Sequence, residues 1–402
     1  MRKRLVLALT MLGLAAALFA WLAPGASPTR AQSVVTPACD PAHEHAAGDS
    51  HETIESGGIT RQYILYVPPS YTGAEAVPLV LLFHGLGQGY ENMYDYTELY
   101  QKADEEGFVI AAPQGTVGSI LATLHWNFLI FLRDLDPNEP DDVAFIGDLL
   151  DSLETDLCID PARVFATGIS NGAEISTRLA CDLSDRIAAI AAISGLYYPP
   201  FSPDLPTEPG CLGTRAVPVL ATHGTADDVI PYEGGPLGVD IPVSVRNIET
   251  EILPEWAAHN RCAPTLTTEA VTDNVDLLSY DGCADGAVVE LYRIEGGMHV
   301  WPGAQEPDQP DPDVNDEVSA NDLLWQFFEA HPLVQQAPPA PTPSATPQST
   351  AEATATAQPA ALPSAGGGAS RGTNGVASLA ALLAGAGALS AAAWFVRTRT
   401  RP

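Results

Sequence analysis

The sequence predicts an α/β fold in which a mostly parallel sheet is covered by helices on both faces. Short apolar, β-branched runs alternate with longer helical stretches between about residues 39 and 333. Strands that are apolar on both sides are buried on both faces, and the helices between them supply the cover. In such sheets the ligand binds beyond the carboxyl ends of the strands, so the chemistry is expected at that edge.

Seven short runs are expected to form the strands because each is apolar and rich in β-branched or aromatic residues. They are Tyr63–Val67, Leu79–Phe83, Val109–Ala112, Val164–Thr167, Ile187–Ile193, Val217–Thr222 and Val288–Ile294. The expected helices between them include Asn92–Glu106, Asp141–Leu157 and Ala173–Asp182.

The composition supports a large folded region and excludes one class of partner. The chain has 402 residues, of which 46% are hydrophobic, so a sizeable core can form. Its formal net charge is −32, and it has no basic patch that could displace counterions from phosphates. Nucleic acid is therefore not expected as a partner. The length suits one large domain with appendages, or two modest domains.

Both ends of the chain carry a hydrophobic run flanked by positive charge. Residues 1–32 have the basic start, apolar run and small-residue end of a secretory signal peptide, with an uncleaved membrane anchor as the alternative. Residues 375–396 carry no charge and are long enough to cross a bilayer as a helix, with a buried amphipathic helix as the alternative. The basic tail, residues 397–402, predicts a cytoplasmic end. The protein is thus expected to be extracellular and tethered to the cell membrane.

The remaining chain divides into a folded part and a linker. Residues 337–374 are rich in Pro, Ala, Thr, Ser and Gly, which predicts a disordered stalk because such a segment cannot bury enough apolar surface to fold. Residues 33–336 are expected to form the α/β domain. The chain has six Cys, and in an oxidising compartment these are expected to form three disulfides.

A candidate nucleophile follows the expected strand Val164–Thr167. The residues Gly168-Ile169-Ser170-Asn171-Gly172 form a Gly-x-Ser-x-Gly motif between a strand and a helix, the context in which α/β-hydrolases carry their nucleophile. The two Gly residues allow a close approach of backbones, and the sharp turn exposes the Ser170 hydroxyl. The alternative is an ordinary Gly-rich turn.

A serine hydroxyl needs a base, and we expect this base to be His299. In α/β-hydrolases the chain order is Ser, then acid, then His, which leaves His259, His299 and His331. His259 lies within an expected helix, and His331 ends one. His299 follows the expected strand Val288–Ile294 directly and therefore lies at the active edge of the sheet.

The acid that orients the base is expected just after the strand Val217–Thr222. Asp227 and Asp228 both lie there, and the turn alone does not separate them. The tetrahedral intermediate also needs preorganised donors for its oxyanion. We expect these to be the backbone N–H groups of Asn171, directly after the nucleophile, and of Leu86, in the loop after the second expected strand. His84 and His223 are expected to brace loops.

Together these blocks resemble the polyhydroxybutyrate depolymerase and feruloyl esterase family of extracellular α/β-hydrolases, from about residue 61 to 331. The most specific pieces are Asp160 to Gly172, His223 to Asp227 and Gly297 to Gly303, with support from Trp126-Asn127, Asp141 to Ile146 and Trp256 to Ala258. The resemblance implies Ser170, Asp227 and His299 as the catalytic triad. It also implies that Trp301 lines the substrate pocket, to which Trp126 is assigned as well.

The sequence departs from the family pattern at two places near the site. Ala173-Glu174 replaces the usual Gly and Met, and Met298 replaces a Gly before the base. Both changes affect the expected substrate preference rather than the catalytic atoms.

The resemblance also implies a Cys262–Cys283 disulfide. For the other cysteines, positions before strands or at a helix end predict the edge opposite the active site and the pairs Cys181–Cys211 and Cys39–Cys158.

No metal or cofactor is expected. The N-terminal group of His43, Glu44, His45, His51 and Glu52 matches no defined metal site. The acidic residues after the base lack the positions of an EF-hand loop and are interrupted by Pro.

The sequence thus predicts a serine esterase that acts on small or oligomeric esters derived from polysaccharide or polyester. Feruloyl or other aromatic esters and short hydroxyalkanoate esters are the expected substrates, with polyhydroxybutyrate or acetylated xylan as alternatives. A surface binding protein that has lost turnover is the non-enzyme alternative.

Overall fold

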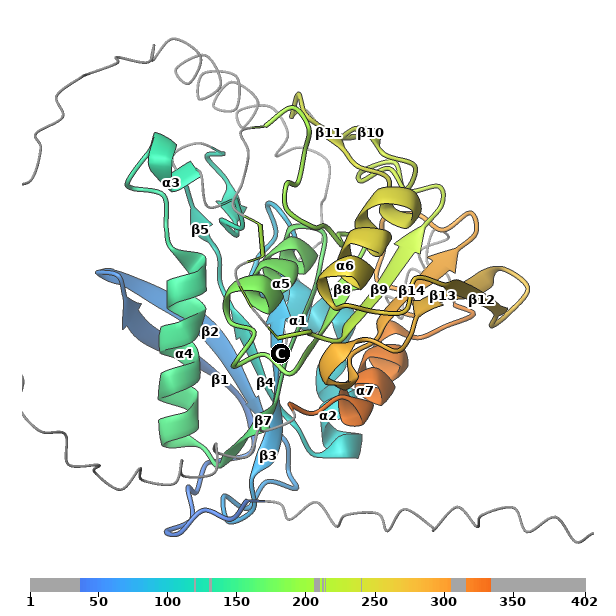
Figure 1. The fold of residues 1–402 in the computed structure, drawn as a ribbon. Coiled ribbons are helices and arrows are strands. Elements are labelled where there is room, and N and C mark those ends of the chain that lie inside the picture. The colour runs from blue at the N-terminus through green and yellow to red at the C-terminus, as the bar shows by residue number, and fades with distance from the viewer. Residues whose placement is uncertain are drawn as a thin grey trace, which may run out of the picture. The chain divides into compact units, whose positions relative to one another are not determined.

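The computed structural model describes residues 37–118, 121–129, 132–205, 210–211, 213, 215–239, 241–304 and 316–333. Its centre is a 10-stranded sheet with the order β1-β2-β4-β3-β7-β8-β9-β14-β13-β12 (Figure 1). The strands are β1 Gly48–Ser56, β2 Ile59–Val67, β3 Val77–Phe83, β4 Val109–Pro113, β7 Ile159–Ile169, β8 Ala189–Ile193, β9 Val219–Gly224, β12 Leu266–Ala270, β13 Val275–Tyr280 and β14 Val289–Ile294. The strands from β4 to β14 in this order are parallel, and antiparallel strands flank them on both sides. This arrangement confirms the predicted α/β-hydrolase fold.

Helices cover both faces of the sheet (Figure 1). One face packs against α4 Asp142–Asp156, α5 Asn171–Asp182 and α6 Leu253–His259, and the other against α1 Tyr90–Thr97, α2 Leu99–Glu106 and α7 Ala320–Ala330. Along β3 the side chains alternate between the two resulting cores, because successive strand residues point to opposite faces.

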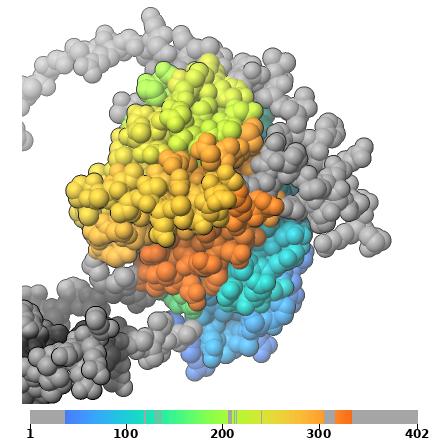
Figure 2. Space-filling view, turned by 90° about the vertical axis from the view of Figure 1, so that its right-hand side faces the viewer, coloured from blue at the N-terminus to red at the C-terminus, as the bar shows by residue number. Residues whose placement is uncertain are grey.

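Local sequence explains how individual helices begin and pack. The carboxylate of Asp141 accepts a hydrogen bond from the Ala144 N–H at 3.0 Å, which caps α4. Phe145, Leu149 and Leu153 then recur at every fourth position and are buried against the sheet. Figure 2 shows α7 beside α2, where Lys102 and Asp322 form an ion pair of 2.6 Å.

The single helix predicted for Asn92–Glu106 is wrong. Glu98 adopts a left-handed backbone conformation with φ 47°, which ends α1 and starts α2. The predicted strands all exist with shifted ends, whereas the hairpins at the two edges of the sheet were not predicted. Smaller elements are the pairs β5 Thr116–Val117 with β6 Leu124–His125 and β10 Gly235–Pro236 with β11 Ser244–Val245, the short helix α3 Leu132–Leu135, the π-helix η1 Ile248–Ile252 and the 3-10 turn η2 Ala284–Gly286.

The six cysteines form the three predicted pairs, Cys39–Cys158, Cys181–Cys211 and Cys262–Cys283. Cys158 directly precedes β7, and Cys181 lies in the last turn of α5. Cys283 precedes β14, which runs parallel to β9. The disulfides therefore fasten the edge formed by the amino ends of the parallel strands, as predicted.

The first and last described segments lie at this same amino edge. The Pro37 carbonyl accepts a hydrogen bond of 2.8 Å from the Ala76 N–H, just before β3. The Leu333 N–H donates to the Ala162 carbonyl, near the start of β7, at 2.7 Å.

Four predicted segments lie outside the described residues: the signal peptide (1–32), the stalk (337–374), the transmembrane helix (375–396) and the basic tail (397–402). Among the helices of the described ranges, none is long and apolar enough to cross a bilayer.

Candidate active site

Ser170 occupies a strained turn between β7 and α5. Its backbone has φ 56° and ψ −123°, a conformation that non-glycine residues rarely adopt. The two motif glycines are explained by the close approach of β3: a Cβ on Gly168 would lie 2.5 Å from the Phe83 carbonyl oxygen, and one on Gly172 only 2.2 Å from it. The turn thus has the strained geometry of a nucleophile elbow at the carboxyl edge of the sheet.

His299 and Asp227 are in direct contact at the same edge. The His299 Nδ1 lies 2.8 Å from the Asp227 Oδ2. The other carboxylate oxygen accepts hydrogen bonds from the N–H groups of Val229 and Ile230 at 2.9 and 2.8 Å. These contacts hold the carboxylate in one orientation, and it can in turn hold the imidazole. Asp228 is exposed, whereas Asp227 is only 5% exposed.

The ionisation of Asp227 suits this role. Burial by itself raises the pKa of the carboxyl, but hydrogen bonds from His223 and His299 outweigh burial and bring the pKa below its ordinary value. The His223 Nε2 lies 3.2 Å from the Asp227 Oδ2 and donates to the Ile230 carbonyl at 2.8 Å. His223 therefore braces the acid loop, as predicted.

The neighbouring parallel strands β9 and β14 bring the loops that carry Asp227 and His299 together. In the pairing of β9 with β14, Gly224 lies opposite Ile294, so both strands end at the same level. The N–H of Ala226 then donates to the Gly297 carbonyl at 3.0 Å. A Cβ on Gly224 would lie 2.0 Å from that same oxygen, so the approach requires glycine.

The loop after β3 lies against Ser170. A Cβ on Gly85 would be 3.5 Å from the Ser170 Cβ. Within this loop, the Gly85 N–H donates to the Gln88 side chain at 3.1 Å and the Gly87 N–H donates to the Leu124 carbonyl at 2.8 Å. These bonds engage the amides on both sides of Leu86 and leave its N–H as the candidate oxyanion donor of the loop.

His84 is held as a neutral brace. It is fully buried, and desolvation lowers the pKa of its imidazole to about 4. Its Nε2 accepts the Gly115 N–H at 2.9 Å, and its Nδ1 donates to the Gly85 carbonyl at 2.8 Å. Both ring nitrogens are thus used within the protein, which agrees with the predicted role.

The pocket role expected for Trp126 and Trp301 is wrong in this structure. Trp126 is 1% exposed and Trp301 0% exposed, so neither side chain offers surface to a ligand. The Trp301 indole N–H donates to the Asn321 side chain at 3.0 Å, and the Trp126 indole N–H donates to the His84 carbonyl at 3.0 Å. The Trp301 ring is thus bonded to α7 and the Trp126 ring to the loop after β3, and both are packed inside the protein.

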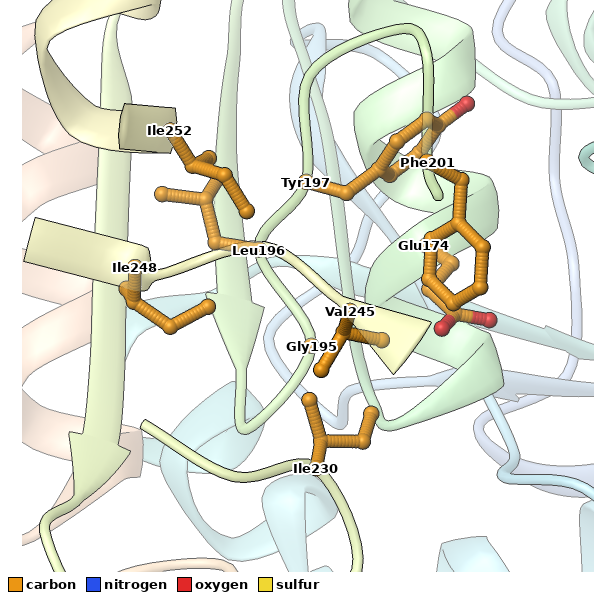
Figure 3. A pocket seen from close by; sticks show the side chains of 9 residues that line it. All are labelled: Glu174, Gly195, Leu196, Tyr197, Phe201, Ile230, Val245, Ile248 and Ile252. Carbon is orange, nitrogen blue, oxygen red and sulfur yellow. The ribbon is translucent and has the colours of Figure 1, made fainter. Parts of the chain in front are cut away.

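A small apolar pocket opens beside the elbow instead (Figure 3). Its cavity volume is only about 10 Å³, and it is lined by Glu174, Gly195, Leu196, Tyr197, Phe201, Ile230, Val245, Ile248 and Ile252. The pocket adjoins Ser170. Gly195, one of its lining residues, lies so close that a Cβ on it would be 2.5 Å from the Ser170 carbonyl oxygen. In Figure 3, Glu174 and Phe201 lie on the α5 side, and Ile248 and Ile252 lie across the pocket from them.

Sequence reasoning missed most residues of this pocket. Leu196 and Tyr197 could have been found, because they follow β8 directly at the carboxyl edge. Val245, Ile248 and Ile252 come from the segment that follows the Asp227 loop, and no motif indicates that this segment packs beside Ser170. Within the described ranges, no group of three or more His, Cys, Asp or Glu side chains could hold a metal ion.

The fold defines the class of the protein, an α/β-hydrolase. The sequence profile of the family described as phospholipase/carboxylesterase matches residues 71–262. The chain is a serine carboxylic ester hydrolase, and in sequence it is feruloyl-esterase-like.

Three similar proteins illustrate this relationship. Feruloyl esterase B of Piromyces equi is 28% identical over 245 residues, which cover 60% of this chain and 42% of that protein. The putative esterase NocK of Nocardia uniformis subsp. tsuyamanensis is 27% identical over 305 residues, 71% of this chain and 85% of its own length. Among solved structures, an acetyl xylan esterase from Aspergillus awamori has a TM-score of 0.48 at 14% identity and covers 70% of this chain and 99% of its own. The predicted resemblance is thus confirmed on its feruloyl-esterase side.

Proposed function

We propose that this chain hydrolyses carboxylic esters outside the cell through a Ser170–His299–Asp227 triad. The observation that carries the proposal is the 2.8 Å contact between His299 and the buried, ionised Asp227, at the sheet edge where Ser170 is held in a strained turn. A base oriented by a carboxylate, at the same sheet edge as a partly exposed serine, is the arrangement that acyl transfer requires.

The mechanism has two steps. His299 takes the Ser170 proton as the hydroxyl attacks the ester carbonyl, and Asp227 stabilises the imidazolium that forms. The backbone N–H groups of Leu86 and Asn171 bind the oxyanion, and the alcohol leaves with the proton from His299. Water then attacks the acyl group while His299 takes its proton, and His299 returns that proton to the Ser170 oxygen as the acid leaves.

The expected substrates are feruloyl or other aromatic esters and short hydroxyalkanoate esters. The apolar lining beside the elbow, with the rings of Tyr197 and Phe201 in it, supports an uncharged, apolar acyl group. Acetylated xylan is the second candidate, because one sequence relative, 27% identical over 246 residues, is a bifunctional acetylxylan esterase/xylanase of Neocallimastix patriciarum. Three disulfides support an exported protein, since such bonds persist in oxidising compartments. The segment 375–396 would then tether it to the membrane.

Replacement of Ser170 tests the mechanism. We expect Ser170→Ala to lower the turnover of p-nitrophenyl acetate by about a thousandfold or more, because the nucleophile is lost. The circular dichroism spectrum should stay that of the wild type. Ser194→Ala is the matched control: Ser194 directly follows the neighbouring strand β8, also has a positive φ of 47°, and should retain turnover.

Wild-type turnover in the Ser170→Ala protein would refute the proposed triad. A fluorophosphonate probe should label Ser170 in the wild type, whereas a binding protein without turnover would give no adduct. A panel of methyl ferulate, hydroxybutyrate oligomers and acetylated xylan then ranks the candidate substrates by kcat/KM.

A further inference from the structure

A short segment, Leu124–Asn127, lies between the two loops that carry the proposed oxyanion donors. We refer to these four residues as the strap. The strap begins in β6 and passes both the loop after β3 and the start of α5. The mechanism proposed above uses none of its residues, although three of the four, His125, Trp126 and Asn127, are almost completely buried, at 1%, 1% and 3% exposed.

On one side, the strap holds the loop of Leu86 at two points. The Leu124 carbonyl accepts the Gly87 N–H at 2.8 Å. The Trp126 indole N–H donates to the His84 carbonyl at 3.0 Å. These two bonds bracket Gly85 and Leu86, so they determine where the Leu86 N–H points.

On the other side, the strap is held by the residue after the nucleophile. The Asn171 Oδ1 accepts the Trp126 N–H at 2.7 Å, and the Asn171 Nδ2 donates to the Trp126 carbonyl at 3.1 Å. The same Nδ2 also donates to the Glu174 carboxylate at 3.1 Å. The Asn171 side chain thus joins the Trp126 backbone to the helix whose first N–H is the second proposed donor.

The strap itself rests on a rigid base. The Asn127 N–H donates to the Asp142 carboxylate at 2.7 Å, and the other oxygen of Asp142 pairs with Arg61 at 2.7 Å. The side chains of this ion pair are only 2% and 0% exposed. The Trp126 ring also packs edge-on against Phe83, the residue before His84, with a centroid distance of 5.1 Å. Little of this arrangement can move independently.

We propose that Trp126 is a positioning residue that fixes the distance between the two oxyanion donors. The inference rests on the proposed function, since it presumes that Leu86 and Asn171 bind the oxyanion. One residue serves both loops: its backbone is paired with Asn171, and its indole N–H is bonded to the His84 carbonyl. Oxyanion donors act by preorganisation, so a small displacement of either loop weakens transition-state binding more than substrate binding.

Trp126→Phe tests this role, because it keeps an aromatic ring and removes the indole donor. We expect kcat for p-nitrophenyl acetate to fall about tenfold with KM nearly unchanged, since the lost interaction acts mainly in the transition state. The affinity for a trifluoromethyl ketone, which forms a tetrahedral adduct with serine, should fall by a similar factor. Activity is expressed per active site titrated with a fluorophosphonate.

Trp325→Phe is the matched control. Trp325 is also a buried tryptophan, 7% exposed, and stacks on Phe108 on the α7 side of the sheet. Its replacement removes the same atoms from a core and should leave kcat, KM and inhibitor affinity at wild-type values. If Trp126→Phe does not fold, Asn171→Ala is the second variant. It removes the side-chain hydrogen bonds from residue 171 to the Trp126 backbone but keeps the backbone N–H of residue 171. The same loss in kcat is expected.

Three outcomes would overturn the inference. Wild-type kcat and inhibitor affinity in Trp126→Phe would show that the indole bond does not position the donors. A raised KM with unchanged kcat would make Trp126 a substrate contact. Fewer titratable sites with normal turnover per site would make its role purely structural. In each case Ser170→Ala still reports on the triad, so failure of the inference is distinct from failure of the proposed function.

Discussion

At the scale of single residues, the environment of Asp227 separates it from its neighbour Asp228. Asp227 is buried, accepts two backbone N–H groups and contacts both His223 and His299. Asp228 is exposed. The sequence alone left both open as the acid, and resemblance to the family favoured Asp227. The contact network supplies the physical reason for that choice.

Asp227→Asn is expected to lower kcat by about four orders of magnitude, because an amide cannot stabilise the imidazolium and permits the wrong histidine tautomer. The measurement is the steady-state hydrolysis of p-nitrophenyl acetate. Asp228→Asn provides the control at the adjacent position and should retain wild-type kcat. Equal losses in both variants would contradict the assignment of the acid.

The same substitution has a pH-dependent effect on stability. The folded pKa of Asp227 lies below its ordinary value of 3.8, so the ionised group adds stability above that pH and loses it as the pH falls toward the lower folded value. The urea midpoint of wild type should therefore exceed that of Asp227→Asn at pH 7, and the difference should shrink below about pH 4.

At the scale of elements, the elbow depends on how closely α5 approaches β3. The carbonyl of Phe83 lies against both motif glycines, so the helix can start only if neither carries a Cβ. This contact lies between residues far apart in sequence. The motif indicates that glycine is needed, but only the fold shows which strand requires it.

Gly172→Ala should therefore destabilise the protein by about 2 kcal/mol or more, because its Cβ would lie 2.2 Å from backbone oxygen and must displace α5 or β3. Chemical denaturation measures the free energy of unfolding. Gly147→Ala on α4 is the control of opposite sign: a Cβ there meets nothing within 4 Å, and the better helix former should add about 0.5–1 kcal/mol. An unchanged free energy of unfolding in Gly172→Ala would contradict the close approach of Gly172 to the Phe83 carbonyl.

At the scale of the whole molecule, the disulfides and the proposed catalytic residues lie at opposite edges of the sheet. The three disulfides lie at the amino ends of the parallel strands, whereas Ser170, Asp227 and His299 lie at the carboxyl ends. Stability and activity should therefore respond differently to loss of a disulfide.

Removal of Cys39–Cys158 by a double Cys→Ser change should cost about 5 kcal/mol, because this bond closes a loop with a sequence separation of 119. Removal of Cys181–Cys211, with a separation of 30, should cost about 3.5 kcal/mol. Thermal unfolding measures both. The kcat at 25 °C should stay at the wild-type value wherever the variant is folded, and a selective loss of kcat would contradict the separation of the two edges.

Those parts of the fold and site that depend on local sequence could be predicted. Ser170 and His299 each follow an apolar strand, and their order along the chain is diagnostic, so both were placed at the correct edge. Trp126 and Trp301 were assigned to the pocket from resemblance and proximity along the chain, which carry no information about burial. The break at Glu98 was missed because a left-handed residue inside a continuous helical pattern has no local signal. The pocket residues Ile248 and Ile252 reach the site only through tertiary packing.

The positions of the first and last residues that the structure describes have a practical consequence. Pro37 and Leu333 are both hydrogen-bonded at the starts of central strands, on the side away from Ser170. A carrier protein or a solid support joined at either end would face the disulfide-bonded side of the molecule. Immobilised in this orientation, the enzyme would present its catalytic entrance to a bulky or surface-bound ester without obstruction by its own attachment.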